Sequence, residues 1–130
     1  MKALVVDDDP VTRRLLRQTL TTQLQVEVIE AANGMVALDA VTREQPDVAI
    51  LDLIMPGLDG MEVLQTLRTW RHTKDLPVIV LTSSTDEAVV RRCLTLRVAA
   101  YLAKPLDPAT VVERVRKVLG PGQADAQRVA

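Results

Sequence analysis

The chain has little of several features that would point to other classes of protein. It contains one cysteine, Cys93, among 130 residues, so an internal disulfide framework is excluded. None of its apolar stretches approaches the roughly 20 residues of a membrane-spanning helix. Its first residues run at once into a strand-like segment rather than a signal peptide. We therefore expect a protein of the reducing cytoplasm with no membrane partner.

An excess of basic charge and a set of aromatic side chains are also missing. The formal net charge is −1 and the pI about 5.8, and lysine and arginine are dispersed. The sequence thus lacks the basic footprint of a nucleic-acid-binding domain, and we expect no direct nucleic-acid ligand. Aromatic residues make up 2% of the chain. Trp70 stands at helical spacing from Val63 and Leu67, which favours a place in or beside the core over a role in stacking on bases.

What is present favours one α/β domain. At 14.3 kDa with 48% hydrophobic residues, the chain has the size and composition to fill a single core. Longer segments with helical patterns separate five apolar runs rich in β-branched residues: Ala3 to Val6, Val26 to Ile29, Val48 to Leu51, Val78 to Leu81 and Ala99 to Leu102. Strand and helix alternate, which predicts a doubly wound parallel sheet with helices on both faces, a three-layer sandwich.

The helices have recognisable starts and faces. Asp9 before Pro10, and Asp107 before Pro108, each predict an N-cap followed by proline in the first turn. Asp59 before Gly60 predicts a third cap. In the first helix one half of the wheel is expected to face the core and the other half to be solvated. The expected core half is Val11, Thr12, Leu15, Leu16, Thr19 and Leu20, and the expected solvated half is Arg13, Arg14, Arg17 and Gln18.

Two later segments differ from this pattern. In the helix expected over residues 86–96, Val90 and Leu94 point about 100° away from the apolar side, and their exposure would imply a partner. Beyond Leu119 there is no apolar period. We therefore expect a domain over residues 1–119 and a flexible tail or the start of a linker over 120–130.

Polar residues stand where four of the apolar runs stop. Asp7 and Asp8, Asp52, Thr82 and Lys104 follow or end these runs, and the carboxyl ends of parallel strands meet at one edge of a sheet, where such sheets bind ligands. Three clustered carboxylates carry charge −3, which a divalent cation and the Lys104 ammonium would neutralise. This pattern predicts a Mg²⁺ site beside a carboxylate that handles a phosphoryl group.

Four motifs carry a family resemblance, and they stand in the order Val5 to Pro10, Leu51 to Gly60, Leu81 to Ser83 and Tyr101 to Pro105. With separations of 45, 30 and 22 residues between Asp7, Asp52, Thr82 and Lys104, the chain resembles the receiver domain of two-component response regulators, including the single-domain chemotaxis type. The resemblance covers Lys2 to about Leu119. It implies a flavodoxin-like (βα)5 fold with strand order 2-1-3-4-5.

The resemblance also implies roles for individual residues. Asp52 would accept a phosphoryl group from a phosphohistidine on a sensor histidine kinase or a histidine phosphotransfer protein. Asp8 and Asp52 would ligate Mg²⁺, or Mn²⁺, together with the backbone carbonyl of Ile54, and Asp7 would act through water. Lys104 would neutralise phosphoryl charge, and its bond to Pro105 would be cis. The chain would be a signalling module rather than an enzyme acting on external substrates.

Signalling in the family uses a coupled threonine and aromatic residue, here Thr82 and Tyr101. Movement of Thr82 toward the phosphoryl group would vacate space for Tyr101 and alter the surface of the fourth helix, fifth strand and fifth helix. We expect phosphorylation to change binding there of an effector protein, of a domain absent from this chain, or of a second copy in a homodimer.

Three positions depart from the family pattern. Arg97 stands where glycine is usual at the end of the fourth helix, so the turn there either accepts strain or changes. Ile54, two residues after Asp52, has no polar group to orient an attacking water, and Ser84 is small and helps little. These two positions predict slow hydrolysis of the phosphoaspartate.

Other interpretations remain open at the sequence level. Asp7 to Val11 also fits the Asp-x-Asp-x-Val motif of haloacid-dehalogenase-like phosphatases, with Asp7 as nucleophile, and the fold could serve as an interaction module without phosphorylation. Docking of a kinase is the alternative to a solvated role for Arg13, Arg14 and Arg17. His72 is expected to be a solvated loop residue.

Overall fold

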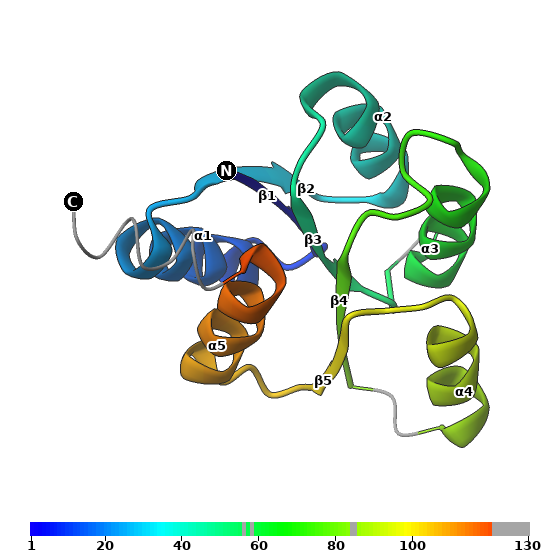
Figure 1. Cartoon of the computed structure of the whole chain (residues 1–130). Coiled ribbons are helices and arrows are strands. Elements are labelled where there is room, and N and C mark those ends of the chain that lie inside the picture. Colours follow the sequence, from blue (N-terminus) through cyan, green and yellow to red (C-terminus); the bar gives the residue numbers. More distant parts are fainter. Residues whose placement is uncertain (56, 58, 84–85, 121–130) are drawn as a thin grey trace.

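The computed structural model describes residues 1–55, 57, 59–83 and 86–120. Five strands and five helices alternate along this part of the chain (Figure 1). The strands are β1 (Lys2–Val6), β2 (Glu27–Ala31), β3 (Val48–Asp52), β4 (Val78–Thr82) and β5 (Ala100–Ala103). The helices are α1 (Pro10–Leu24), α2 (Gly34–Glu44), α3 (Gly60–Thr69), α4 (Glu87–Thr95) and α5 (Pro108–Leu119).

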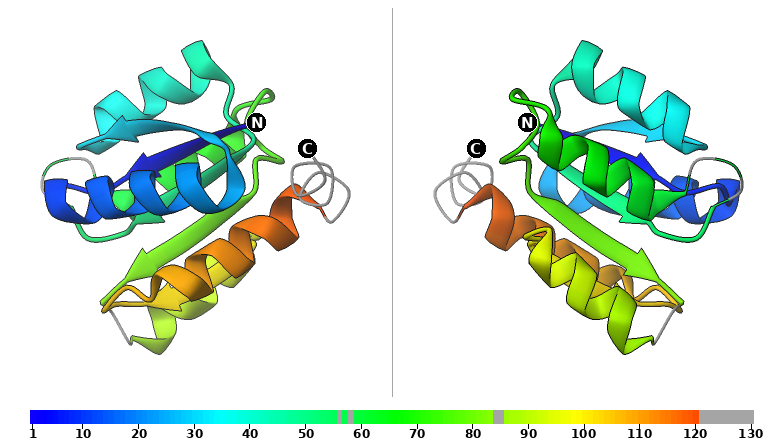
Figure 2. Two further views of the ribbon diagram at one scale, coloured as in Figure 1. Left: turned by 90° about the vertical axis from the view of Figure 1, so that its left-hand side faces the viewer. Right: turned by 90° about the vertical axis from the view of Figure 1, so that its right-hand side faces the viewer.

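The strands form one parallel sheet in the order β2-β1-β3-β4-β5, which confirms the predicted fold and strand order. Helices α1 and α5 cover one face, and α2, α3 and α4 cover the other (Figure 1). Figure 2 views the molecule from these two sides, with α1 and α5 toward the viewer on the left and α3 and α4 toward the viewer on the right. The strand order reverses beside β1, between β1 and β3, so the carboxyl ends of these two strands border the place where sheets of this kind bind ligands.

Alternation along the central strands gives the sheet two separate cores. Leu4, Leu51 and Val80 face α2, α3 and α4, where Leu64 and Leu67 pack against them. Val5 and Ile50 face α1 and α5 on the opposite side. Every residue of β3 and β4 is buried, as expected for the interior strands of a sheet covered on both faces.

The predicted helix caps are present. The Asp9 carboxylate accepts hydrogen bonds from the Val11 amide, at 3.0 Å, and from the Thr12 hydroxyl, at 2.9 Å. Asp107 accepts in the same way from the residues that follow it, at the start of α5. Asp59 accepts from the amide of Glu62 at 2.9 Å. These three carboxylates are therefore occupied by helix starts.

The wheel prediction for α1 is only partly right. Leu16 and Leu20 are buried as expected, but Val11 is 70% and Leu15 40% exposed. The residues of α1 that the sheet and α5 bury begin at Leu16, so the first turns of the helix extend beyond this cover. Arg13 was expected to be solvated, yet its side chain is only 17% exposed and makes hydrogen bonds to Glu30 on β2 and to the carbonyl of Asp7, the residue after β1.

At the end of α4 the backbone accepts a strained conformation. Arg97 has φ +60°, in the left-handed region that glycine occupies at low cost. The Arg68 side chain from α3 donates to the carbonyl of Leu96 at 2.7 Å and to that of Arg97 at 3.4 Å. Of the two outcomes foreseen for this position, the chain retains the turn and bears the strain.

The described residues include no helix that is long and apolar enough to cross a membrane. Residues 121–130 of the expected tail lie outside the described part of the chain, as do Pro56, Leu58 and Ser84. The boundary at residue 119 therefore stays a prediction.

Candidate metal and phosphoryl-transfer site

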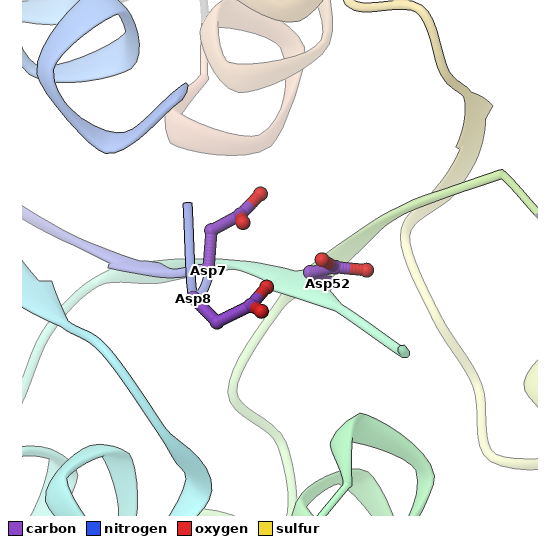
Figure 3. A group of neighbouring side chains, drawn as sticks. All are labelled: Asp7, Asp8 and Asp52. Carbon is purple, nitrogen blue, oxygen red and sulfur yellow. The ribbon is translucent and has the colours of Figure 1, made fainter. Parts of the chain in front are cut away.

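Three carboxylates meet at the carboxyl edge of the sheet. Val6 and Leu51 are partners in the pairing of β1 and β3, so Asp7 and Asp52, the next residues, leave adjacent strands side by side. One oxygen from each of Asp7, Asp8 and Asp52 lies within 4.8 Å of the others (Figure 3). Asp7 and Asp52 are buried, whereas Asp8 is exposed. The sheet thus assembles an acidic cluster from positions 45 residues apart.

Asp7 is held on every side. Its Oδ1 accepts from the amide of Asp9 at 2.9 Å, and its Oδ2 accepts from Nζ of Lys104 at 3.1 Å. Its amide donates to the carbonyl of Ala31 on β2 at 3.1 Å. Its own carbonyl accepts from Nη1 of Arg13 at 2.7 Å. Both the backbone and the carboxylate of Asp7 are therefore fixed.

The two carboxylate oxygens of Asp52 have different partners, one in the segment that follows β3 and the other at Lys104. Oδ1 accepts from the amide of Ile54 at 3.0 Å, and Oδ2 accepts from Nζ of Lys104 at 3.1 Å. Burial raises the pKa of Asp52 above its usual value, although the hydrogen bonds from Ile54 and Lys104 act in the opposite direction and the charge of Asp7 adds to the rise. The ionised form of this carboxylate is therefore favoured by added positive charge.

Lys104 bridges the two buried acids from the end of β5. Its side chain is 26% exposed. Burial alone would lower the pKa of Lys104, but the hydrogen bonds and charges of Asp52 and Asp7 outweigh it, and the pKa is raised. The amide of Lys104 donates to the carbonyl of Thr82 at 2.9 Å, which places the side chain, and the bond to Pro105 is cis as expected.

The four ionised groups carry a net charge of −2, which one divalent cation balances. Oxygen donors of this kind suit Mg²⁺, and Mn²⁺ accepts the same ligands. Oxygens on opposite sides of a Mg²⁺ ion lie about 4.2 Å apart, at about 2.1 Å from the metal. A cluster spread over 4.8 Å is therefore close to the required size, and a water between the ion and one carboxylate would close the difference.

The predicted switch pair lies on one face of the sheet. Tyr101 on β5 is the pairing partner of Val80, and Thr82 comes two residues later on β4, so both side chains project toward the core under α3 and α4. Thr82 is fully buried and Tyr101 is half-buried. Burial raises the pKa of the Tyr101 hydroxyl.

The structure adds a residue whose importance the sequence did not reveal. A Cβ on Gly60 would overlap the carbonyl oxygen of Asp52 and lie 2.8 Å from its carbonyl carbon. The amide of Gly60 also donates to the carbonyl of Leu53 at 3.0 Å. The start of α3 thus packs directly on the backbone of Asp52. An aspartate-glycine pair signals a turn, but nothing in it reveals this close approach.

Comparison with known proteins agrees with this geometry. A sequence profile of the response regulator receiver domain matches residues 3–116. A chemotaxis protein CheY homolog of Campylobacter jejuni is 36% identical over 126 residues, covering 96% of this chain and 97% of the relative. The crystallised chemotaxis protein CheY4 of Vibrio cholerae superposes with a TM-score of 0.83 at 30% identity, covering 90% of this chain and 97% of that one. A response regulator receiver protein from Pseudomonas putida gives a TM-score of 0.84 at 27% identity, with 89% and 95% covered.

Proposed function

Because this chain belongs to the response regulator receiver family of two-component systems, we propose that it takes a phosphoryl group onto Asp52 in a reaction that depends on Mg²⁺. The donor would be a phosphohistidine on a sensor histidine kinase or a histidine phosphotransfer protein. One observation carries the proposal: Asp7, Asp8 and Asp52 form a single acidic cluster, and Lys104 bridges two of its members. A cytoplasmic location belongs to the same proposal.

In the proposed reaction a carboxylate oxygen of Asp52 attacks phosphorus while the bond from phosphorus to the donor nitrogen breaks. The electron pair of that bond stays on the imidazole of the donor. Such a transfer needs positioning and neutralisation of phosphoryl charge more than further chemistry. The amide of Ile54 donates to Oδ1 of Asp52. The Lys104 ammonium, which donates to Oδ2, can pair with the phosphoryl oxygens instead once the group is transferred.

The metal site would use Asp8, Asp52 and the backbone carbonyl of Ile54 as direct ligands, with Asp7 acting through water. When bound, Mg²⁺, or Mn²⁺ in its place, would supply the two positive charges that the cluster lacks. Asp8 is exposed and so can receive a hydrated ion from solvent, whereas Asp7 is buried and already accepts from Lys104 and from the backbone. This difference supports a direct role for Asp8 and an indirect one for Asp7.

The signal would leave through Thr82 and Tyr101. The Thr82 hydroxyl would donate to a phosphoryl oxygen, and Tyr101 would move into the space that Thr82 vacates. The output surface would be that of α4, β5 and α5, where Leu94 is 63% exposed. Its partner would be an effector protein, a domain outside this chain or a second copy in a homodimer that forms on phosphorylation.

Intact mass tests the proposal. Native protein incubated with a small acyl phosphate and Mg²⁺ should gain the mass of one phosphoryl group, whereas Asp52→Asn should not. Chelation of the metal should abolish the gain. A phosphoryl mimic should then shift amide resonances on α4, β5 and α5. Unchanged resonances on that face would refute the switch without refuting the transfer.

The same experiment separates the two alternatives that the sequence left open. The phosphatase motif would need Asp9 as its second acid, but this carboxylate caps α1. Such an enzyme would also need an acidic pair after Lys104, and Asp107, which follows closely, caps α5. Turnover of external phosphomonoesters with Asp7 phosphorylated would nevertheless establish that activity. Failure of acyl phosphate to modify the native protein would favour an interaction module that works without phosphorylation.

A further inference from the structure

Arg13 on α1 makes contacts that its place on the helix wheel does not explain. Nη1 donates to the carbonyl of Asp7 at 2.7 Å, and Nε donates to Oε1 of Glu30 on β2 at 3.2 Å. Its side chain is only 17% exposed, against 59% for Arg17, one turn further along the helix. A planar guanidinium is suited to holding two acceptors at fixed directions. Arg13 thus joins α1, β2 and the residue that follows β1, next to the acidic cluster.

The carbonyl that Arg13 holds belongs to the peptide group between Asp7 and Asp8. The amide of Asp7 is fixed as well, through the carbonyl of Ala31 at the end of β2. The direction of the Asp8 side chain follows from the backbone on either side of it. Because Asp8 is exposed, packing does little to orient it, and the fixed peptide has the larger effect.

We infer that Arg13 is a positioning residue for the cation site: its hydrogen bond to the Asp7 carbonyl, braced by Glu30, orients Asp8 toward the ion. The inference rests on the proposed function, because it assigns Asp8 to the metal. Removing a group that orients a metal ligand commonly weakens metal binding by about tenfold or more. Arg13 acts on the site through the backbone and does not touch the ion.

Charge and position make opposite predictions for this residue, which gives a sharp test. Arg13 is positive and lies near a cation site, so by charge alone its neutralisation would tighten Mg²⁺ binding. By position, the same change frees the peptide before Asp8 and weakens binding. Arg13→Gln should therefore weaken Mg²⁺ binding by about tenfold. Arg13→Lys keeps the charge but lacks the planar guanidinium that reaches both acceptors. Its Mg²⁺ affinity should fall between those of the native protein and the glutamine variant.

Arg17→Gln is the matched control. It removes the same charge and also breaks an ion pair, in which Nη1 of Arg17 lies 2.9 Å from Oε2 of Glu30. Among the described residues, however, it is Arg13 and not Arg17 that donates to the carbonyl of Asp7. Its charge is exposed and screened, so Mg²⁺ affinity should change by less than about twofold. Glu30 is shared by both arginines, so any effect of disturbing it appears in the control as well.

The experiment is a titration of the full, unphosphorylated chain with MgCl₂. Binding is measured by calorimetry and by the amide resonances of Asp8 and Asp52. Urea unfolding without metal is measured in parallel. A merely structural role would lower stability and leave Mg²⁺ affinity unchanged. Weaker binding by both Arg13 variants and normal binding by the Arg17 variant would support the inference.

Native affinity or tighter binding in Arg13→Gln would overturn it. If the glutamine variant did not fold, the lysine variant would decide in the same way, since charge alone predicts native affinity for it. If the native chain itself bound no Mg²⁺ at Asp52, the proposed function would fail together with the inference. If the native chain bound the ion and both Arg13 variants bound it equally well, the inference alone would fail.

Discussion

Replacing Lys104 by methionine should leave two buried carboxylates without their shared cation. Lys104 lies 3.1 Å from both Asp7 and Asp52, whose side chains are 2% and 5% exposed. Methionine keeps the length and apolar stem of the side chain but removes the ammonium. The change therefore isolates the contribution of the positive charge.

Two estimates bound the loss of folding free energy in Lys104→Met. Removing one partner of a buried ion pair costs about 3 to 5 kcal/mol. A carboxyl with an ordinary pKa near 3.9 can escape this cost by taking a proton, which at pH 7 requires about 4 kcal/mol. Since the Lys104 side chain is 26% exposed, water screens part of the interaction. We expect Lys104→Met to lower the free energy of unfolding by about 3 kcal/mol at pH 7 without Mg²⁺.

The pH dependence has a definite sign. The pKa of Asp52 is raised in the folded state, so this group stabilises the fold below its unfolded pKa and loses that contribution as the pH rises through its folded pKa. Without Lys104 the folded pKa rises further. The difference between variant and native protein should therefore be small near pH 4 and grow toward neutral pH, by at most about 1.4 kcal/mol per unit for each carboxyl.

Urea unfolding from pH 4 to 8, with EDTA and with excess Mg²⁺, measures these effects. Mg²⁺ should restore most of the stability of the variant, because it replaces the missing charge and at 100 times its dissociation constant contributes about 2.7 kcal/mol. Lys117→Met is the control: its ion pair with Glu113 is on the surface, its side chain is 65% exposed, and its loss should cost less than about 1 kcal/mol. A Lys104 variant as stable as native protein at pH 7 in EDTA, or equally weakened at pH 4, would refute the reasoning.

Three further changes have expected outcomes. Gly60→Ala should lower the free energy of unfolding by more than about 3 kcal/mol, because its Cβ would overlap the Asp52 carbonyl; native stability in urea would contradict the close approach. Ile54→Asn should shorten the lifetime of the phosphorylated protein several-fold, since an amide can orient the attacking water; decay of the native form that is equally fast or faster would refute slow hydrolysis. Arg97→Gly should raise the free energy of unfolding by about 1 kcal/mol by relieving its φ of +60°, and a loss in thermal or urea unfolding would show that the arginine contacts outweigh the strain.

Much of the site could be predicted because it follows from strand ends. In a parallel sheet the residues after each strand reach the same edge, so Asp7, Asp52 and Lys104 converge once the strands are recognised. The helix caps were equally predictable. An aspartate before proline or glycine is a local signal, and at Asp9 the local signal decides the structure.

What the sequence did not reveal depends on contacts between distant segments. The wheel of α1 cannot tell where the sheet stops covering the helix, so Val11 and Leu15 were wrongly placed in the core. Arg13 was wrongly placed in solvent, because one of its partners is a backbone carbonyl and the other, Glu30, lies on strand β2. The approach of Gly60 to Asp52 is likewise a property of the folded backbone.

The most direct test of the central claim is the position of the phosphoryl group. Protein treated with acyl phosphate and Mg²⁺ can be reduced with borohydride, which converts a phosphorylated aspartate to homoserine, and then digested and sequenced by mass spectrometry. The account predicts homoserine at position 52. Homoserine at position 7 or 8 instead, or unmodified aspartate at all three positions in protein that had gained the phosphoryl mass, would contradict it.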